Sequence, residues 1–507
     1  MCAANASSSL GVDVSLERNS PHCPHGPTLL FERYTAKGHH KRQRYYACSA
    51  CRDRKDCNFF QSADEKVSEA RSKVREEYNR AQQPWKSHED FYQRMEATND
   101  LSPQKRRFCQ DCSLLLRLSE AGEHAEHTVR SGLSDDALRQ PSHLLVPLEN
   151  SKTNAQYLFS TKSTEFLMST VKKLGFNRVL CVGVPRLHEA IQAKRSCGLS
   201  SLLLDIDHRY GQFYPPTLFC RYNMFNHHFF EGEPSRDVCR EFLHRNHGDD
   251  VVVVTDPPFG GRVEILVEVL KKIMELWKEG ADGPDSPAEL PVMWIFPYFL
   301  EHRIFEGLPS FVMLDYKVEY ENHPLFQSSK KACKKGSPVR IFTNIIPSKI
   351  VLPASDGYRF CEECSRYVSP ENVHCKDCKS CTSKDGSTYT HCKLCNRCVK
   401  PVTVHCLDSL LTARNQPNLE KRVLPLCFEI NGASLSVTAR VQVRYQWKAV
   451  YVHCQSCQQC ALPDHQCDRQ KDKVGCHICG SLDHKRRDCP EQFNKVFRHK
   501  KRRKDSS

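Results

Sequence analysis

The sequence contains no apolar run that approaches the roughly 18 residues a membrane-spanning helix needs. Residues 1–9 also lack the basic and apolar segments of a secretory signal. Acidic residues are in deficit, since 60 Asp and Glu stand against 74 Lys and Arg and leave a net charge of +14. We therefore expect a cytosolic or nuclear protein without membrane contact, whose charge favours polyanionic partners such as nucleic acid. The charge alone is also compatible with an ordinary soluble basic protein.

Cysteine, in contrast, is abundant, with 29 residues in a chain of 507. Many stand as Cys-x-x-Cys pairs with histidine nearby, a spacing typical of zinc ligation in a reducing compartment. A single hydrophobic core seldom grows past about 250 to 300 residues. We therefore predict three or more domains, one of catalytic size and the others small zinc-binding modules.

Composition shifts predict seven segments along the chain. The residues before the first cysteine cluster are small and polar and predict disorder. Toward the C-terminus cysteine replaces apolar runs, so metal must substitute there for a hydrophobic core. The basic run Arg498 to Lys504 fits a nuclear or nucleolar signal, an RNA-contacting tail or a merely solvated end. The predicted boundaries are 1–20 (disordered N-terminus), 21–61 (first zinc module), 62–143 (helical linker with a second zinc site), 144–350 (central domain), 358–470 (Cys/His-rich repeats), 474–490 (zinc knuckle) and 491–507 (basic tail).

The central domain alternates short β-branched apolar runs with helical patterns. This order favours a mostly parallel sheet covered on both faces, so we predict an α/β, Rossmann-like domain. Two later apolar runs are spaced like an antiparallel pair that closes one edge of the sheet. The predicted elements are strands at 178–183, 201–206, 250–255 and 291–296, helices at 186–194 and 262–279, and the later runs at 311–320 and 338–346.

The tetrapeptide Asp256-Pro257-Pro258-Phe259 directly follows the apolar run 251–255. Ligands of open α/β sheets bind at such strand ends. An exocyclic purine amine is a weak nucleophile, so an enzyme must hold its N–H groups with acceptors such as the Asp256 side chain and the Pro257 carbonyl. The prolines stiffen the loop, and Phe259 can stack on a base that has left its own stack. The alternative is a plain strand-ending turn.

The tetrapeptide resembles the [Asp/Asn]-Pro-Pro-[Tyr/Phe/Trp] signature of amino-directed N-methyltransferases, which use S-adenosylmethionine. The order of elements in the central domain is similar to that family's. The resemblance implies an α/β, Rossmann-like class I methyltransferase core with flanking small zinc-binding modules. It also implies a cofactor over the first strand at Gly183, with ribose hydroxyls held by Asp205 or Asp207.

The first turn of this domain departs from the family pattern. A full Gly-x-Gly-x-Gly is absent, and Arg186 stands where small residues are usual. Gln156-Tyr157-Leu158-Phe159 resembles a cofactor-contacting stretch of related RNA N6-adenosine methyltransferases, which would compensate. The alternative for this stretch is a helix or strand packed on the sheet edge.

The first cysteine cluster resembles a GRF-type zinc finger. That resemblance assigns zinc to Cys23, His25, Cys48 and Cys57, and leaves Cys51 as an extra thiol or a substitute ligand. Arg44-Tyr45-Tyr46 and Phe59-Phe60 interleave charge with aromatic rings, as a surface that stacks single-stranded bases would.

The second cluster has four donors with unusual histidine spacing, Cys109, Cys112, His124 and His127. The number of donors predicts a zinc site. The alternative is a surface helix that carries scattered histidines.

The third cluster repeats His-Cys-x2-Cys-x2-Cys, a regularity that predicts several zinc ions. Val404-His405-Cys406 recurs as Val452-His453-Cys454, and removing residues 407–454 would restore one continuous repeat, so we infer an in-frame insertion. Without it, the candidate ligands suffice for about four tetrahedral zinc ions. They are Cys361, Cys364, His374, Cys375, Cys378, Cys381, His391, Cys392, Cys395, Cys398, His405, Cys406, Cys457, Cys460, His465 and Cys467.

The fourth cluster, Cys476, Cys479, His484 and Cys489, has the full spacing of a CCHC zinc knuckle. Such knuckles typically bind single-stranded RNA, although a purely structural zinc site is the alternative.

Together the four clusters and the catalytic signature resemble the ribosomal RNA N6-adenosine methyltransferase family. This resemblance implies methylation of adenine N6 in large-subunit ribosomal RNA and residence in the nucleus, the nucleolus and also the cytoplasm. Two alternatives stay open: an RNA-binding adaptor with a decayed cofactor pocket, and an amine methyltransferase that acts on DNA or protein.

Overall fold

The computed structural model of the chain forms two units, residues 1–352 with 471–507 and residues 353–470, and each is described by itself. None of the helices in the described parts of the chain is both long and apolar enough to cross a bilayer. The structure describes residues 9–17, 19–35, 42–51, 53–148, 156–194, 198–244, 250–279, 289–323, 337–393, 396–399, 402–405, 446–449, 452–454 and 459–461.

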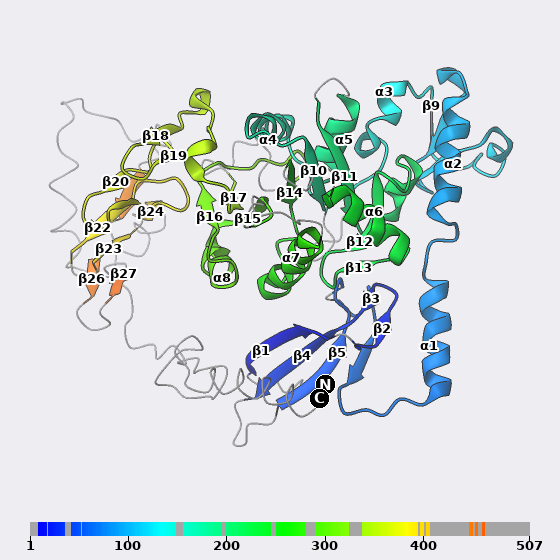
Figure 1. The fold of residues 1–507 in the computed structure, drawn as a ribbon, viewed down its shortest axis with the longest axis horizontal. Helices are drawn as coiled ribbons and strands as arrows, with labels where there is room; N and C mark the ends of the chain where they lie inside the picture. Colours follow the sequence, from blue (N-terminus) through cyan, green and yellow to red (C-terminus); the bar gives the residue numbers. More distant parts are fainter. Residues whose placement is uncertain are drawn as a thin grey trace, which may run out of the picture. The chain divides into compact units, whose positions relative to one another are not determined.

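The first unit begins with a four-stranded sheet in the order β1-β4-β5-β6, built by β1 (Ser9–Leu16), β4 (Leu29–Thr35), β5 (Arg42–Ala47) and β6 (Phe60–Ser62) (Figure 1). Here the prediction of a disordered segment 1–20 is wrong for Ser9–Leu16, which pairs antiparallel with β4. The apolar residues Val12, Val14 and Leu16 alternate with polar ones, and this period of two supports the strand although the composition is polar. The short hairpin β2 (His22–Cys23) and β3 (Gly26–Pro27) carries the first predicted zinc ligands.

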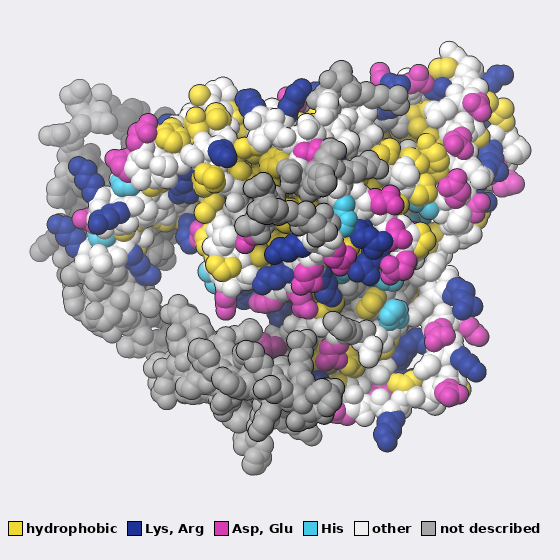
Figure 2. Space-filling model, viewed as in Figure 1, with side chains coloured by type: hydrophobic (Ala, Val, Ile, Leu, Met, Phe, Trp, Pro, Cys, Tyr) yellow, Lys and Arg dark blue, Asp and Glu magenta, His cyan; other side chains and the backbone are white. Residues whose placement is uncertain are grey.

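Helices α1 (Glu69–Ala81) and α2 (His88–Asn99) confirm the helical part of the segment 62–143. No residue of α1 is buried, and Figure 2 shows basic and acidic side chains interspersed along it. Helix α2 is fixed by a capping box between Ser87 and Asp90 and buries Phe91 and Met95. A three-stranded sheet follows, with β7 (Arg107–Cys109) between β8 (Leu114–Leu116) and β9 (Val129–Ser131).

The central domain contains an eight-stranded sheet in the order β13-β12-β11-β10-β14-β15-β17-β16. Strands β12, β11, β10, β14 and β15 run parallel, whereas β13, β17 and β16 add antiparallel edges. The antiparallel pair predicted from the two late apolar runs is therefore confirmed. The strands are β10 (Arg178–Val182), β11 (Ser200–Asp205), β12 (Phe219–Asn223), β13 (His228–Phe229), β14 (Val251–Thr255), β15 (Val292–Pro297), β16 (Val312–Leu314) and β17 (Val339–Thr343).

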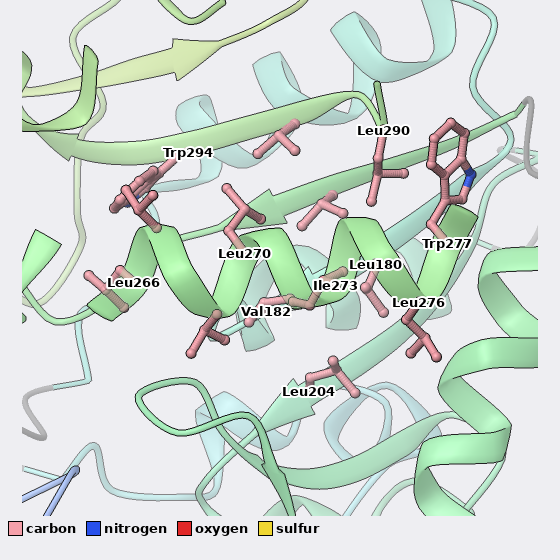
Figure 3. Close-up of a cluster of buried hydrophobic side chains, with 14 of the residues drawn as sticks. Leu180, Val182, Leu204, Leu266, Leu270, Ile273, Leu276, Trp277, Leu290 and Trp294 are labelled. Atoms are coloured by element: carbon pink, nitrogen blue, oxygen red, sulfur yellow. The ribbon is translucent and has the colours of Figure 1, made fainter. Parts of the chain in front are cut away.

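Every residue of β10, β14 and β15 is buried, which indicates that both faces of this sheet are covered. Helix α4 packs on α5, which lies against β10 and β11, while α7 packs against α6 and α8. Figure 3 shows the apolar face of α7 directed at the sheet, with Leu266, Leu270, Ile273, Leu276 and Trp277 facing Leu180, Val182, Leu204, Leu290 and Trp294. The helices are α4 (Thr161–Lys173), α5 (Pro185–Ala193), α6 (Glu233–His244), α7 (Val263–Lys278) and α8 (Glu301–Gly307).

The second unit is a series of small two-stranded sheets with little apolar core, as predicted for a metal-held region. Its hairpins repeat one register, in which His374 pairs with Cys381, His391 with Cys398, and His453 with Cys460. The strands are β18 (Arg359–Cys361), β19 (Arg366–Val368), β20 (His374–Cys375), β21 (Ser380–Cys381), β22 (Thr390–Cys392), β23 (Arg397–Val399), β24 (Val402–His405), β25 (Gln446–Ala449), β26 (Val452–Cys454) and β27 (Gln459–Ala461).

Candidate active site and metal centres

A pocket of about 1210 Å³ lies where the central parallel strands end. Gly183 follows β10, Asp205 ends β11 and Asp256 follows β14, so residues far apart in the sequence meet at one edge of the sheet. The predicted residues in its lining are Gln156, Tyr157, Gly183, Asp205, Asp207, Asp256, Pro257, Pro258 and Phe259.

Asp256 directly follows the carboxyl end of β14, in a position largely shielded from solvent. Its backbone N–H donates to the Val182 carbonyl at 3.3 Å, which ties the loop to the neighbouring strand. The Tyr320 hydroxyl donates to Asp256 Oδ1 at 3.0 Å. Burial raises the pKa of the Asp256 carboxyl well above its ordinary value, and the Tyr320 hydrogen bond opposes that rise.

Aromatic rings surround this carboxyl. The Phe259 ring is 5.9 Å from the Tyr157 ring and 5.9 Å from the Tyr320 ring, measured between centroids. His323 lies 4.2 Å from Tyr157 and 6.5 Å from Phe259. Phe259 keeps part of its surface exposed to the pocket, so its face can receive a flat ligand.

Gly183 has a φ of +68°, a conformation that favours glycine. A Cβ atom at this position would lie 2.4 Å from Met224 Cε and 3.5 Å from the Asp256 carbonyl oxygen. Glycine is therefore favoured here by the backbone conformation, and a larger residue would also force the flexible end of Met224 to move. The remainder of the usual glycine loop is replaced by Pro185, which begins α5.

The two acids at the carboxyl end of β11, Asp205 and Asp207, have different surroundings. Asp207 accepts hydrogen bonds from Gln156 Nε2 at 2.8 Å and from the Arg209 side chain at 2.7 Å, and these bonds hold its pKa below the ordinary value although burial alone would raise it. Asp205 accepts from the Asp207 backbone amide at 2.9 Å. Burial, reinforced by the Asp207 charge, raises the pKa of Asp205 to about 7.

Three residues predicted for the cofactor lie outside the pocket lining. Phe159 is buried and bridges to Tyr320, and Leu158 is buried beside it. Arg186 instead contacts Glu321 and donates to Ser142 Oγ at 2.6 Å. The stretch that contains Leu158 and Phe159 thus packs at the sheet edge, while its Gln156 and Tyr157 reach the pocket.

The first zinc module contributes to the pocket wall through His25 and Ala50. The Asn223 side-chain amide donates to the His25 carbonyl at 2.8 Å, and the Asn226 amide donates to the same oxygen at 3.0 Å. Both asparagines are buried, at 1% and 3% exposure. His25 was predicted only as a zinc ligand, and no sequence signal pointed to the lining residues Ala50, Arg209, Arg221, Met224 and Phe225.

The first metal centre brings together the four predicted ligands Cys23, His25, Cys48 and Cys57, with donor atoms within 4.8 Å of one another. Cys48 Sγ lies 3.5 Å from His25 Nδ1, close to the roughly 3.6 Å separation between donors expected of tetrahedral zinc with Zn–S of about 2.3 Å. Cys51 Sγ faces the other nitrogen, Nε2, at 3.6 Å. Cys51 is therefore an extra thiol beside the site and not a substitute ligand.

The second metal centre also assembles as predicted, from Cys109, Cys112, His124 and His127. Cys109 begins the turn between β7 and β8, and His127 Nδ1 lies 3.4 Å from Cys112 Sγ. The two histidines belong to a turn that leads into β9, so the alternative of a surface helix with scattered histidines is wrong.

In the second unit the donors are interleaved between repeats. Among the described residues, the His and the last Cys of the first repeat join Cys361 and Cys364, and the two central cysteines of that repeat join the His and the last Cys of the second repeat. The resulting groups are Cys361, Cys364, His374 and Cys381, and then Cys375, Cys378, His391 and Cys398. Cys378 Sγ lies 3.7 Å from Cys398 Sγ, a separation that fits tetrahedral zinc.

Cys392 is described in the structure, but in neither of these groups. For His405 and Cys460 only the backbone is described: His405 pairs with Gln446, and Cys460 with His453. The remaining predicted ligands lie outside the described residues: Cys395, Cys406, Cys457, His465, Cys467, Cys476, Cys479, His484 and Cys489.

Comparison with known proteins gives two family matches and several relatives. A family described as probable N6-adenine methyltransferase matches residues 150–330, and the GRF zinc finger family matches residues 21–66. Relatives named rRNA N(6)-adenosine-methyltransferase ZCCHC4 occur in Homo sapiens, with 48% identity over 99% of this chain and 91% of the relative, and in Mus musculus, with 49% identity over 95% and 85%. The relative of that name in Xenopus tropicalis is 51% identical over 72% of this chain and 76% of its own.

Proposed function

This chain belongs to the rRNA N(6)-adenosine-methyltransferase ZCCHC4 family, and from that premise we propose that it methylates adenine N6 in large-subunit ribosomal RNA, using S-adenosylmethionine. The observation that carries the proposal is the half-buried Asp256 on a proline-braced loop beside an open pocket of about 1210 Å³. The lining of this space combines aromatic and apolar side chains with a few carboxylates, the composition typical of a ligand pocket.

We assign the central domain to the Rossmann-like class I methyltransferases. The chain passes from β10 outward through β11 and β12, then returns to the other side of β10 and continues through β14 and β15. The switch point of the sheet thus lies between β10 and β14. Ligands of doubly wound sheets bind outside the strand ends at such a point, and the pocket lies there.

In this reaction the protein orients the amine and the bound cofactor supplies an activated methyl group. The Asp256 carboxylate and the Pro257 carbonyl accept the two N6–H bonds and aim the nitrogen lone pair at the methyl carbon. When bound, the cofactor would supply the methyl carbon for the new C–N bond and would keep the electron pair of the broken C–S bond on its sulfur. The extra proton on N6 would pass to Asp256 or to water. Phe259 stacks on the adenine and holds it outside its helix.

Within the cofactor site we assign the ribose hydroxyls to Asp205. Asp207 already accepts bonds from Arg209 and Gln156, so its acceptor capacity is used within the protein. Gly183 leaves space for the close approach of the cofactor beside Met224.

Single-stranded RNA fits the surface of the first zinc module. Phe31, Tyr45 and Phe60 stack in a column with centroid separations of 5.4 and 5.1 Å, and the Arg54 guanidinium lies 4.8 Å from the Phe60 ring. The column lies in a groove of about 1520 Å³ that also reaches Phe225, which lines the cofactor pocket as well. Stacked rings with cations suit unpaired bases. Nucleolar and nuclear residence, with some protein in the cytoplasm, follows as part of the proposal.

Incubation of the protein with radiolabelled S-adenosylmethionine and RNA, followed by nucleoside analysis, tests this function. The proposal expects label in N6-methyladenosine of the large-subunit ribosomal RNA, and stronger competition by unlabelled RNA than by DNA of the same sequence. Label in DNA or protein instead would favour the alternative amine methyltransferase. Binding of RNA with no measurable cofactor binding would favour an adaptor.

A further inference from the structure

Tyr320 is the partner of the catalytic carboxyl, although it lies 64 residues further along the chain. Its ring is buried to 2% exposure, and its hydroxyl donates to Asp256 Oδ1 at 3.0 Å. Tyr320 does not belong to the Asp-Pro-Pro-Phe signature, and it is absent from the lining of the pocket. Its hydroxyl therefore acts on the reaction through Asp256, while its ring packs against Tyr157 and Phe259 of the pocket lining.

We propose that Tyr320 is a positioning residue for methyl transfer, which holds Asp256 Oδ1 and keeps this side chain in the form that accepts a hydrogen bond from the adenine amine. The inference deepens the proposed function and rests on it. The reason is chemical. A desolvated carboxyl tends to hold its proton, and a protonated carboxyl would offer an O–H to the amine where an acceptor is needed. A buried hydroxyl donor favours the ionised form and also prevents rotation of the carboxylate.

The position of Tyr320 is itself fixed by the segment that reaches the cofactor pocket. The Glu321 N–H donates to the Leu158 carbonyl and the Leu158 N–H donates to Asn322 Oδ1, each at 2.8 Å. The Asn322 amide donates to the Gln156 carbonyl at 2.7 Å.

Gln156 in turn donates through Nε2 to Asp207 Oδ2 at 2.8 Å. A continuous series of hydrogen bonds and backbone pairing therefore connects Asp207, beyond the end of β11, with Asp256, which follows β14. These bonds give the buried stretch around Leu158 and Phe159 a role: it holds Tyr320 in place while lying outside the pocket lining.

The test compares Tyr320→Phe with Tyr222→Phe, using the full-length protein. Tyr222 is also buried, and its hydroxyl bonds to His227 Nδ1 at 2.9 Å, so the control removes a similar buried hydrogen bond in β12, away from Asp256. We expect Tyr320→Phe to lower kcat by about 10- to 100-fold, the size of one lost hydrogen bond to a charged group, with KM for RNA and cofactor within about twofold. Tyr222→Phe should keep kcat within about twofold.

The pH profile separates positioning from simple damage. Without the Tyr320 hydroxyl, the acid limb of the kcat profile should move to higher pH by about one pH unit, because the ionised carboxylate loses a donor. An unchanged kcat, or a loss confined to KM with the acid limb unmoved, would overturn the proposal. An equal loss in Tyr222→Phe would overturn it too, since the effect would then belong to folding.

A titration of Asp carboxyl carbons by ¹³C NMR keeps this test independent of the proposed function. It reads the ionisation of Asp256 without any substrate, with Asp256→Asn to assign the signal. We expect the Asp256 transition to move to higher pH in Tyr320→Phe, and an unmoved transition would refute the role of Tyr320. Absence of methyl transfer by the wild-type protein would instead refute the function alone.

Discussion

Asp205 makes cofactor binding dependent on pH near neutrality. Burial and the adjacent Asp207 charge raise its pKa to about 7, so the carboxyl of the free protein is about half ionised there. Ribose hydroxyls donate to the ionised form most strongly. Cofactor binding therefore selects the carboxylate, and affinity should rise with pH until Asp205 is fully ionised.

The magnitude follows from the titration of one group. With a pKa of about 7, roughly 0.09 of the molecules are ionised at pH 6 and roughly 0.91 at pH 8. The apparent affinity for S-adenosylmethionine should thus increase about tenfold between these pH values. Asp207, whose pKa lies below the ordinary value, stays ionised throughout the range and contributes no slope.

Isothermal titration calorimetry at several pH values measures this slope. Asp205→Asn is the matched control, because it keeps the shape of the side chain but removes its titration, and any slope that remains belongs to the cofactor or to other groups. Between pH 6 and pH 8, the affinity of the wild-type protein for the cofactor should increase by a factor about tenfold larger than that of the control. Equal slopes in the two proteins, or tighter wild-type binding at pH 6, would refute the assignment of Asp205.

Three further perturbations test other parts of the account. Gly183→Ala should weaken cofactor binding about tenfold by calorimetry, because its left-handed φ costs about 1–2 kcal/mol for other residues and the new Cβ would displace the Met224 side chain, which lines the pocket. Near-normal affinity would contradict this account of the loop. Removing residues 476–489 should weaken RNA binding and flatten its salt dependence in filter-binding assays, and an unchanged salt slope would argue against the knuckle as an RNA contact. Deleting residues 407–454 should raise the number of zinc ions per chain measured by mass spectrometry, and an equal count would argue against an insertion that disturbs the array.

Most of the central sheet could be predicted because its buried strands and its main helix have strong periodicity. The runs of valine in β14 and the amphipathic pattern of α7 place both elements within about two residues of the predicted ends. Strands β12 and β13 were not predicted, because they are short and mix aromatic residues with Arg, Asn and His. Strand β1 was predicted to be disordered because the small, polar composition of residues 1–20 hides the short alternation of apolar and polar residues within it.

The candidate site was predictable where one local motif carries the chemistry, as at Asp256 and Asp205. Tyr320 was not, because its role depends on a tertiary contact: Tyr320 lies outside the strands of the sheet, pairs with Phe159 in an isolated bridge, and reaches Asp256 across 64 residues of sequence. The spacing of the Cys and His residues also could not predict which of them share one zinc ion. Each Cys/His repeat offers four donors and could close on itself, and only the folded hairpins distribute them between neighbouring repeats.

The most direct measurement compares wild-type protein and Asp256→Ala on large-subunit ribosomal RNA, with methyl transfer and RNA affinity recorded on the same preparations. Our account predicts N6-methyladenosine from the wild-type protein, loss of methyl transfer in Asp256→Ala, and RNA affinity within about twofold, since the carboxylate holds the amine and not the phosphates. Methylation by Asp256→Ala at the wild-type rate, or an equal loss of methylation and RNA binding, would contradict it.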